Sequence, residues 1–305
     1  MKQWHPDYQD CDIDIADYRQ FVVPGCPVAF RGPAIDPLHA PQGSFFSCLG
    51  AAQTFGRFIS RPFPDILAEA NGLDALNLSV GGAGPGFVLQ YPELITAMNR
   101  GRFVILQCMS ARHESNSRFR AEGYIEYLND MRHGDIVDSV TAWTRILDEE
   151  PDEAPRYLQE SRESWLETTR KLVSVLTVPV VFFWFSRREP DLAIDWEAIH
   201  AGLGHRPTGE LVSMIYGEFP QLIDRTTADR AAEMCAARAS YTGDRGMGAP
   251  LISLTTGRPI NPADYEDKGI EYRVIQAGRN LYYPSAEMHE DAARSLQPVI
   301  ESLSC

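Results

Sequence analysis

Three short apolar runs in the first third of the chain constrain its fold more than any other feature. They are SFFSCLGAAQTFGRF at residues 44–58, ALNLSVGGAGPGF at 75–87 and RFVILQCMSAR at 102–112. Each run ends in small or polar residues, and a helical pattern follows it. Repeated strand–turn–helix units are typical of α/β proteins, which gather functional groups at the carboxyl ends of parallel strands. The runs therefore predict a mostly parallel sheet with a site at this edge.

Two further strands are expected, at 178–185 (VPVVFFWF) and at 271–278. Helical patterns are expected at 56–70, 86–99, 164–176, 224–239 and 285–303. In the last of these, Met288, Ala292, Leu296 and Ile300 recur every four residues, as on one face of a helix. Five strands separated by helices predict a three-layer αβα sandwich whose five-stranded, mostly parallel sheet has the flavodoxin-like order.

The predicted body spans residues 44–305 as one α/β domain, with an insertion around 117–177. The insertion is expected to be mostly helical because it shows no strand alternation. Residues 1–43 are expected to form an arm that packs on the body, since five prolines within residues 22–43 exclude a long helix there. Whether the arm covers a site or meets another subunit is left open.

The charge and composition of the chain limit the kinds of partner that it can bind. The chain of 305 residues has a formal net charge of −14, which repels phosphate backbones and makes nucleic acid an unsuitable partner. Its longest apolar run has eight residues, too few to span a bilayer, and no signal peptide is evident at the start. The six cysteines form no CxxC pair, so neither a metal site nor a cofactor is predicted. We expect a cytoplasmic protein that acts on a small-molecule or carbohydrate substrate; a homodimer is compatible with the sequence.

The first two turns resemble those of the SGNH (GDSL) hydrolase superfamily. In that family the first strand ends in Gly-Asp-Ser-x-Thr-x-Gly, with the serine as nucleophile. Residues 50–56 have the same frame: Gly50, Thr54 and Gly56 are in place, whereas Ala51 and Ala52 occupy the aspartate and serine positions. A serine nucleophile needs a hydroxyl, so hydrolysis by the family mechanism from Ala52 is excluded.

The remaining blocks of the family are matched in part. NLSVGGA at 77–83 is similar to the second block, which implies that Gly81 or Gly82 supplies an oxyanion-hole amide. The third block, Gly-x-Asn-Asp, is absent, because the third strand runs into CMSAR at 108–112. AEMH at 286–289 keeps the histidine of the fourth block, His289, and lacks its aspartate. The whole chain also resembles an uncharacterised group of proteobacterial proteins classed as a domain of unknown function.

These turns supply the predicted site. Ser110 and His289 are the catalytic candidates, with His289 as general base and either Ser110 or a hydroxyl of the substrate as nucleophile. The residues predicted to bind an anionic or ester-bearing substrate are Gln53, Thr54, Gly81, Gly82, Arg112, His113, Asn116 and Arg118. Backbone amides of glycine turns and arginine forks both suit carboxylate, phosphate or sulfate. Arg187 and Arg188 follow the fourth strand and are further candidates for substrate contact.

Each candidate also has a structural interpretation. The GGAGPG turn can serve close strand–helix packing, and Arg112 and Arg118 can pair with carboxylates of this acidic protein. Ser110 can cap a helix, and His289 can be a surface or capping residue. Two functions follow: an SGNH-like enzyme with a rebuilt site that carries out ester or group transfer, or an inactive SGNH-like module that binds a glycan or small ligand.

Overall fold

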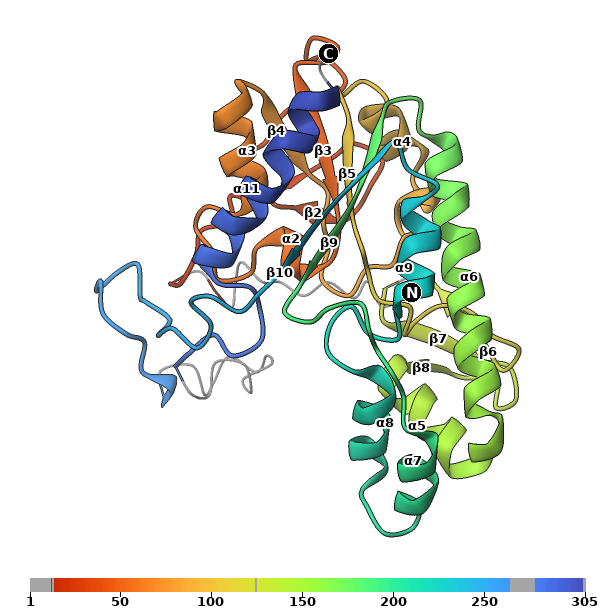
Figure 1. Cartoon of the computed structure of the whole chain (residues 1–305). Coiled ribbons are helices and arrows are strands. Elements are labelled where there is room, and N and C mark those ends of the chain that lie inside the picture. Colours follow the sequence, from red (N-terminus) through yellow and green to blue (C-terminus); the bar gives the residue numbers. More distant parts are fainter. Residues whose placement is uncertain (1–11, 13, 124, 264–277, 304–305) are drawn as a thin grey trace.

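The computed structural model describes residues 12, 14–123, 125–263 and 278–303, and a five-stranded parallel sheet lies at its centre (Figure 1). The strands are β3 (Phe45–Leu49), β4 (Asp74–Asn77), β5 (Val104–Gln107), β9 (Val180–Ser186) and β10 (Ala237–Thr242). Their order across the sheet is β10-β9-β5-β3-β4, and every neighbouring pair is parallel. Numbered along the chain, this order is 2-1-3-4-5, which confirms the predicted flavodoxin-like α/β fold.

Helices cover both faces of the sheet. On one face α3 (Phe63–Asn71) and α11 (Ala286–Leu303) pack on Phe46, Ile105 and Phe183. On the other face lie α4 (Pro92–Met98), α6 (Ala154–Val175) and α9 (Arg225–Ala232), as Figure 1 shows. The three central strands are buried along their whole length, which explains why each reads as a continuous apolar run.

The described part of the arm is bound to the segment that follows β3, the first strand of the central sheet. It contains a two-stranded antiparallel sheet of β1 (Phe21–Val22) and β2 (Ala29–Phe30). The buried guanidinium of Arg31 donates hydrogen bonds to the carbonyls of Phe55, Gly56, Ile59 and Ser60. Asp12 and Arg57 form an ion pair of 2.9 Å whose two side chains are fully buried. These contacts hold the arm against the short helix α2 (Ala52–Phe55).

The insertion differs from its mostly helical prediction. It begins with an antiparallel sheet of β6 (Phe119–Glu122), β7 (Tyr127–Asp130) and β8 (Ile136–Asp138). Only then do the helical segments α5 (Ser139–Glu149), η2 (Pro151–Glu153) and α6 follow. The strands have three or four residues and bury one or two side chains each, so no alternation was visible. The small sheet, α5, α7 (Trp196–Gly202) and α8 (Thr208–Tyr216) extend away from the main sheet, whereas α6 runs alongside it (Figure 1).

The fifth strand is also not where the sequence placed it. Residues 224–239 were expected to be helical, but α9 ends at Ala232 and β10 begins at Ala237. This strand lies at the edge of the sheet, and its small and polar side chains give a weak strand signal. The strand expected at 271–278 falls almost entirely outside the described residues. The remaining short helix is η1 (Val88–Gln90), and in the described ranges no helix is long and apolar enough to cross a membrane.

Candidate functional site

The turn after β3, which we call the elbow (residues 50–56), is held in place by Gln107 of the neighbouring strand. The Gln107 Oε1 atom accepts hydrogen bonds from the Ala51 backbone amide at 3.0 Å and from the Thr54 hydroxyl at 2.7 Å. A Cβ at Gly50 would lie 2.4 Å from that same oxygen, so only glycine fits there. Thr54 is fully buried and serves this turn rather than a ligand.

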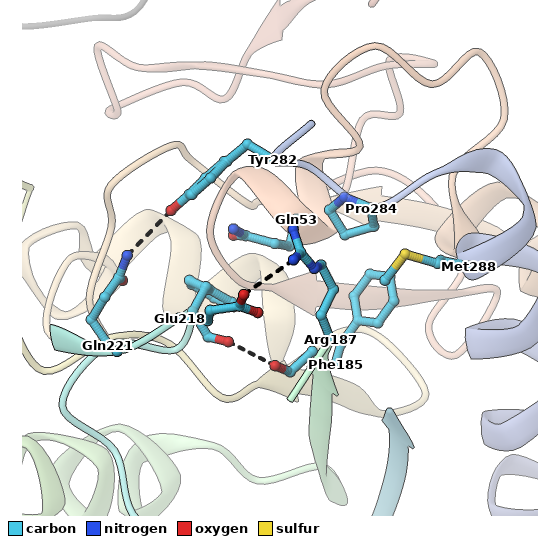
Figure 2. A pocket seen from close by; sticks show the side chains of 11 residues that line it. Gln53, Phe185, Arg187, Glu218, Gln221, Tyr282, Pro284 and Met288 are labelled. Atoms are coloured by element: carbon cyan, nitrogen blue, oxygen red, sulfur yellow. Dashed lines mark hydrogen bonds and ion pairs between the residues drawn. The ribbon is translucent and has the colours of Figure 1, made fainter. Parts of the chain in front are cut away.

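A cavity of about 180 Å³ lies beside the elbow at the carboxyl end of the sheet (Figure 2). Its wall comes from Gln53 of the elbow, residues 185–187 at the end of β9, residues 217–219 and 221, and residues 282, 284 and 288. We call this cavity the elbow pocket. Parallel α/β sheets bind ligands at this edge, so its position agrees with the prediction from the three apolar runs.

Polar and aromatic groups both face the elbow pocket. In Figure 2, Gln53 projects toward Tyr282 and Gln221, and the ring of Phe185 forms the opposite wall with Met288. The Gln53 Oε1 atom is buried and has no hydrogen-bond partner among the described residues. An unpartnered buried amide oxygen costs about 1–3 kcal/mol, a cost that a ligand or water donor would remove. Gln53 is thus the predicted residue that the structure places most directly in the pocket.

Ser110 lies one hydrogen bond behind the pocket. Its hydroxyl accepts from the Gln221 backbone amide at 3.0 Å, and the same hydroxyl donates to the Gln221 Oε1 atom. Gln221 in turn donates from Nε2 to the Tyr282 hydroxyl at 3.2 Å. The donor hydrogen of the Ser110 hydroxyl and one of its two acceptor positions are therefore used for holding Gln221. No helix begins at Ser110 either, so it is neither a free nucleophile nor a helix cap.

His289 does not occupy the position of a general base. It is fully buried in α11, where its ring stacks on Phe63 and meets the edge of Phe185. Its Nδ1 atom accepts a hydrogen bond from the Phe63 backbone amide at 3.1 Å. Burial, with a smaller effect from Arg31, lowers the pKa of His289 to about 3. Its burial among these rings and its low pKa favour a structural role for His289 over the predicted role of general base.

The glycine turn and Arg112 face the insertion instead of the elbow pocket. Gly82 has a positive φ of 75°, and a Cβ there would lie 2.5 Å from Glu126 Cγ. Glu126 also forms an ion pair of 2.9 Å with Arg112. Neither Gly81 nor Gly82 lines the elbow pocket. The side chain of Glu126 thus takes the place beside this turn that an anionic ligand was predicted to occupy.

Arg118 and Asn116 are structural residues of the insertion. The buried Arg118 guanidinium contacts Glu149 at 2.7 Å and Glu150 at 3.4 Å, which matches its interpretation as a partner of carboxylates. The Asn116 Oδ1 atom accepts the backbone amides of Arg118 and Phe119, which fixes the turn before β6. Neither residue lines the elbow pocket.

His113 and Glu114 are buried together under the glycine turn. A Cβ at Gly84 would lie 3.0 Å from His113 Nε2 and 3.5 Å from Glu114 Oε1. Within the described residues, neither ring nitrogen of His113 has a hydrogen-bond partner. Burial and the neighbouring Arg112 lower the pKa of His113 to about 3, and burial raises the pKa of Glu114 to about 7. The sequence did not predict that Glu114 is buried, because its burial depends on α6, which is distant in sequence.

Three polar residues of the elbow pocket were not predicted from the sequence: Glu218, Gln221 and Tyr282. They lie on connecting segments that carry no motif, and only the folded chain brings these segments to the end of β9. Among the described residues, no three His, Cys, Asp or Glu side chains are grouped so that they could hold a metal ion.

Comparisons with known proteins found one family profile and several solved structures of low sequence identity. The profile of a domain of unknown function, DUF6473, matches residues 7–122, and no curated protein sequence matches the chain. An extracellular lipase from Streptomyces rimosus shares 12% identity over 86% of this chain and 100% of its own, with a TM-score of 0.40. A GDSL-like lipase from Bacteroides thetaiotaomicron shares 12% over 88% and 94%, with a TM-score of 0.37.

A family two carbohydrate esterase from Clostridium thermocellum, solved with cellohexaose, shares 8% identity over 90% of this chain and 66% of its own, with a TM-score of 0.39. TM-scores this low carry no argument about activity. The assignment to the flavodoxin-like α/β class therefore rests on the strand order of the chain itself.

Proposed function

We propose that this protein binds a small, hydroxyl-bearing ligand of about the size of one sugar ring in the elbow pocket, without the ester hydrolysis of SGNH enzymes. One observation carries the proposal. A pocket lined by amide and aromatic groups persists at the elbow, whereas Ala52 lacks a hydroxyl and His289 is sealed in the core.

The pocket has the size and chemistry for such a ligand. At about 30 Å³ per water molecule, a cavity of about 180 Å³ holds about six waters, which corresponds to a compact ring with its substituents. The unpartnered Gln53 Oε1 atom requires a donor, and the Tyr282 hydroxyl, which accepts from Gln221, can donate its own hydrogen. When the Gln53 amide turns about its last bond and presents Oε1 to the pocket, a ligand hydroxyl can donate to this oxygen and accept from Tyr282. The rings of Phe185 and Tyr282 offer apolar faces to the carbon skeleton.

The alternative, ester or group transfer, receives less support from the geometry. It requires a nucleophile and a base within hydrogen-bond reach of each other. Ser110 is engaged with Gln221 on both sides, and the ring of His289 contacts Phe63 and Phe185. Binding without covalent chemistry is therefore the function that the described residues support best.

Calorimetric titration with D-glucose and D-glucuronate tests the proposal, together with an assay of p-nitrophenyl acetate hydrolysis. We expect saturable binding of at least one sugar, its loss in Gln53→Leu, and no enzymatic hydrolysis. Gln159→Leu is the matched control, because it makes the same change on the exposed surface of α6. The proposal is wrong if neither sugar binds, or if the wild type hydrolyses the ester at ordinary enzymatic rates.

A further inference from the structure

Arg187 differs from the other arginines near the sheet edge because part of its hydrogen-bonding capacity is unused. Of its five N–H donors, described residues take two: one binds the Leu281 carbonyl at 3.3 Å and one binds Glu218 Oε1 at 3.1 Å. Its side chain lines the elbow pocket and is 35% exposed. Figure 2 shows the Arg187 guanidinium joined to Glu218 by the drawn ion pair.

The neighbouring arginine shows what a purely structural role looks like. Arg188 directs its guanidinium to the backbone carbonyls of Glu218, Glu189, Pro220 and Ile223. These bonds fix the loop that forms one wall of the elbow pocket. Arg112 and Arg118 are likewise engaged with carboxylates of the insertion. Arg187 is thus the arginine that combines spare donors with a place in the pocket wall.

The partner of Arg187 can be exchanged. Glu218 is 54% exposed, and an ion pair between two side chains this exposed contributes only about 0–1 kcal/mol. A ligand carboxylate held by the pocket could bind the planar fork of Arg187 through two parallel hydrogen bonds and let Glu218 turn to solvent. In a protein with a net charge of −14, an anion needs such a local cation to enter at all.

We infer that the ligand of the elbow pocket is a hydroxylated carboxylate, such as a sugar acid, whose carboxylate binds Arg187 in place of Glu218. This inference rests on the proposed function, because it adds a charge and a contact to the ligand assigned there. Gln53 and Tyr282 would bind the hydroxyl-bearing ring, and Arg187 would select the acid over its neutral counterpart.

Titration of the same protein with D-glucuronate and D-glucose tests this inference, because the two sugars differ by a carboxylate against a hydroxymethyl group. We expect D-glucuronate to bind at least about tenfold more tightly, as a hydrogen bond to a charged group allows. Added NaCl should weaken the binding of the acid and leave that of glucose unchanged.

Three variants separate the contact from general effects of charge. Arg187→Gln should abolish the preference for the acid, and Arg187→Lys, which keeps the charge but not the fork, should retain part of it. Glu218→Gln should strengthen binding of D-glucuronate, because it removes the competing carboxylate. The control Glu210→Gln removes the same charge from the exposed first turn of α8 and should have no effect.

The outcomes show separately whether the selection of the acid by Arg187 fails and whether sugar binding itself fails. Equal binding of both sugars, or a preference for the acid that survives in Arg187→Gln, would overturn the inference and leave the proposed function standing. Binding of neither sugar would overturn the proposed function and this inference with it.

Discussion

Glu114 makes the stability of the fold depend on pH in a way that one substitution can expose. Its side chain is 1% exposed, and its Oε2 atom accepts hydrogen bonds from Ser164 at 3.1 Å and Thr168 at 3.3 Å. Burial outweighs these bonds and raises the pKa of Glu114 from 4.5 to about 7. The folded protein therefore binds a proton more tightly than the unfolded chain does. Stability that is present below pH 4.5 is lost as the pH rises through about 7.

The magnitude follows from the size of the shift. A rise in the pKa of Glu114 from 4.5 to about 7 corresponds to about 3 to 4 kcal/mol of stability, and most of it is lost between pH 5 and pH 8. Glu114→Gln resembles the protonated acid in shape and hydrogen bonding and cannot ionise. We expect the variant to gain roughly 2 to 3 kcal/mol over the wild type when the pH is raised from 5 to 8.

Urea unfolding of both proteins at pH 5, 6, 7 and 8 measures this difference. The comparison cancels the opposite effect of His113 and His289, whose lowered pKa values make the protein less stable as the pH falls below about 6.5. Glu167→Gln, an exposed change on α6, serves as the control and should show no such trend. A constant difference in the free energy of unfolding between wild type and Glu114→Gln across this range would show that Glu114 does not titrate between pH 5 and pH 8.

Three further predictions concern the elbow, the arm and the glycine turn. Ala52→Ser should restore the hydroxyl of the elbow without producing esterase activity, because His289 is sealed from the pocket. Turnover of p-nitrophenyl acetate by this variant would show that His289 is accessible from the pocket. Arg57→Met should lower the free energy of unfolding by about 3–5 kcal/mol in urea, because the buried Asp12 carboxylate loses the guanidinium that forms an ion pair with it. Gly82→Ala should lower it by about 1–2 kcal/mol, since its φ of 75° is strained for any side chain; an unchanged unfolding midpoint would show that the turn can relax.

The fold could be predicted where the strands are buried on both faces. The strands β3, β5 and β9 are buried along their whole length and consist mostly of apolar residues, so these runs and the turns after them were sufficient. The edge strand β10 and the small sheet of the insertion were missed because short strands with few buried residues leave little pattern. Their positions depend on tertiary packing rather than on local sequence.

The candidate site was predictable in place but only in part by residue. The repeated strand–turn–helix units predicted the elbow and the carboxyl edge of the sheet, and Gln53 and Arg187 line the pocket there. Sequence proximity to a turn could not show that Thr54 points into the turn itself or that Arg118 meets carboxylates of α5 and the residue after it. Nor could it show that Gln221 and Tyr282 meet across 61 residues of chain.

A crystal structure of the protein grown with D-glucuronate would show whether the elbow pocket binds a ligand without covalent chemistry at the elbow. We expect an intact sugar in the elbow pocket, with a hydroxyl at the Gln53 amide and the carboxylate at Arg187. An empty pocket at saturating sugar, or a sugar bound at the glycine turn beside Glu126 instead, would contradict this expectation.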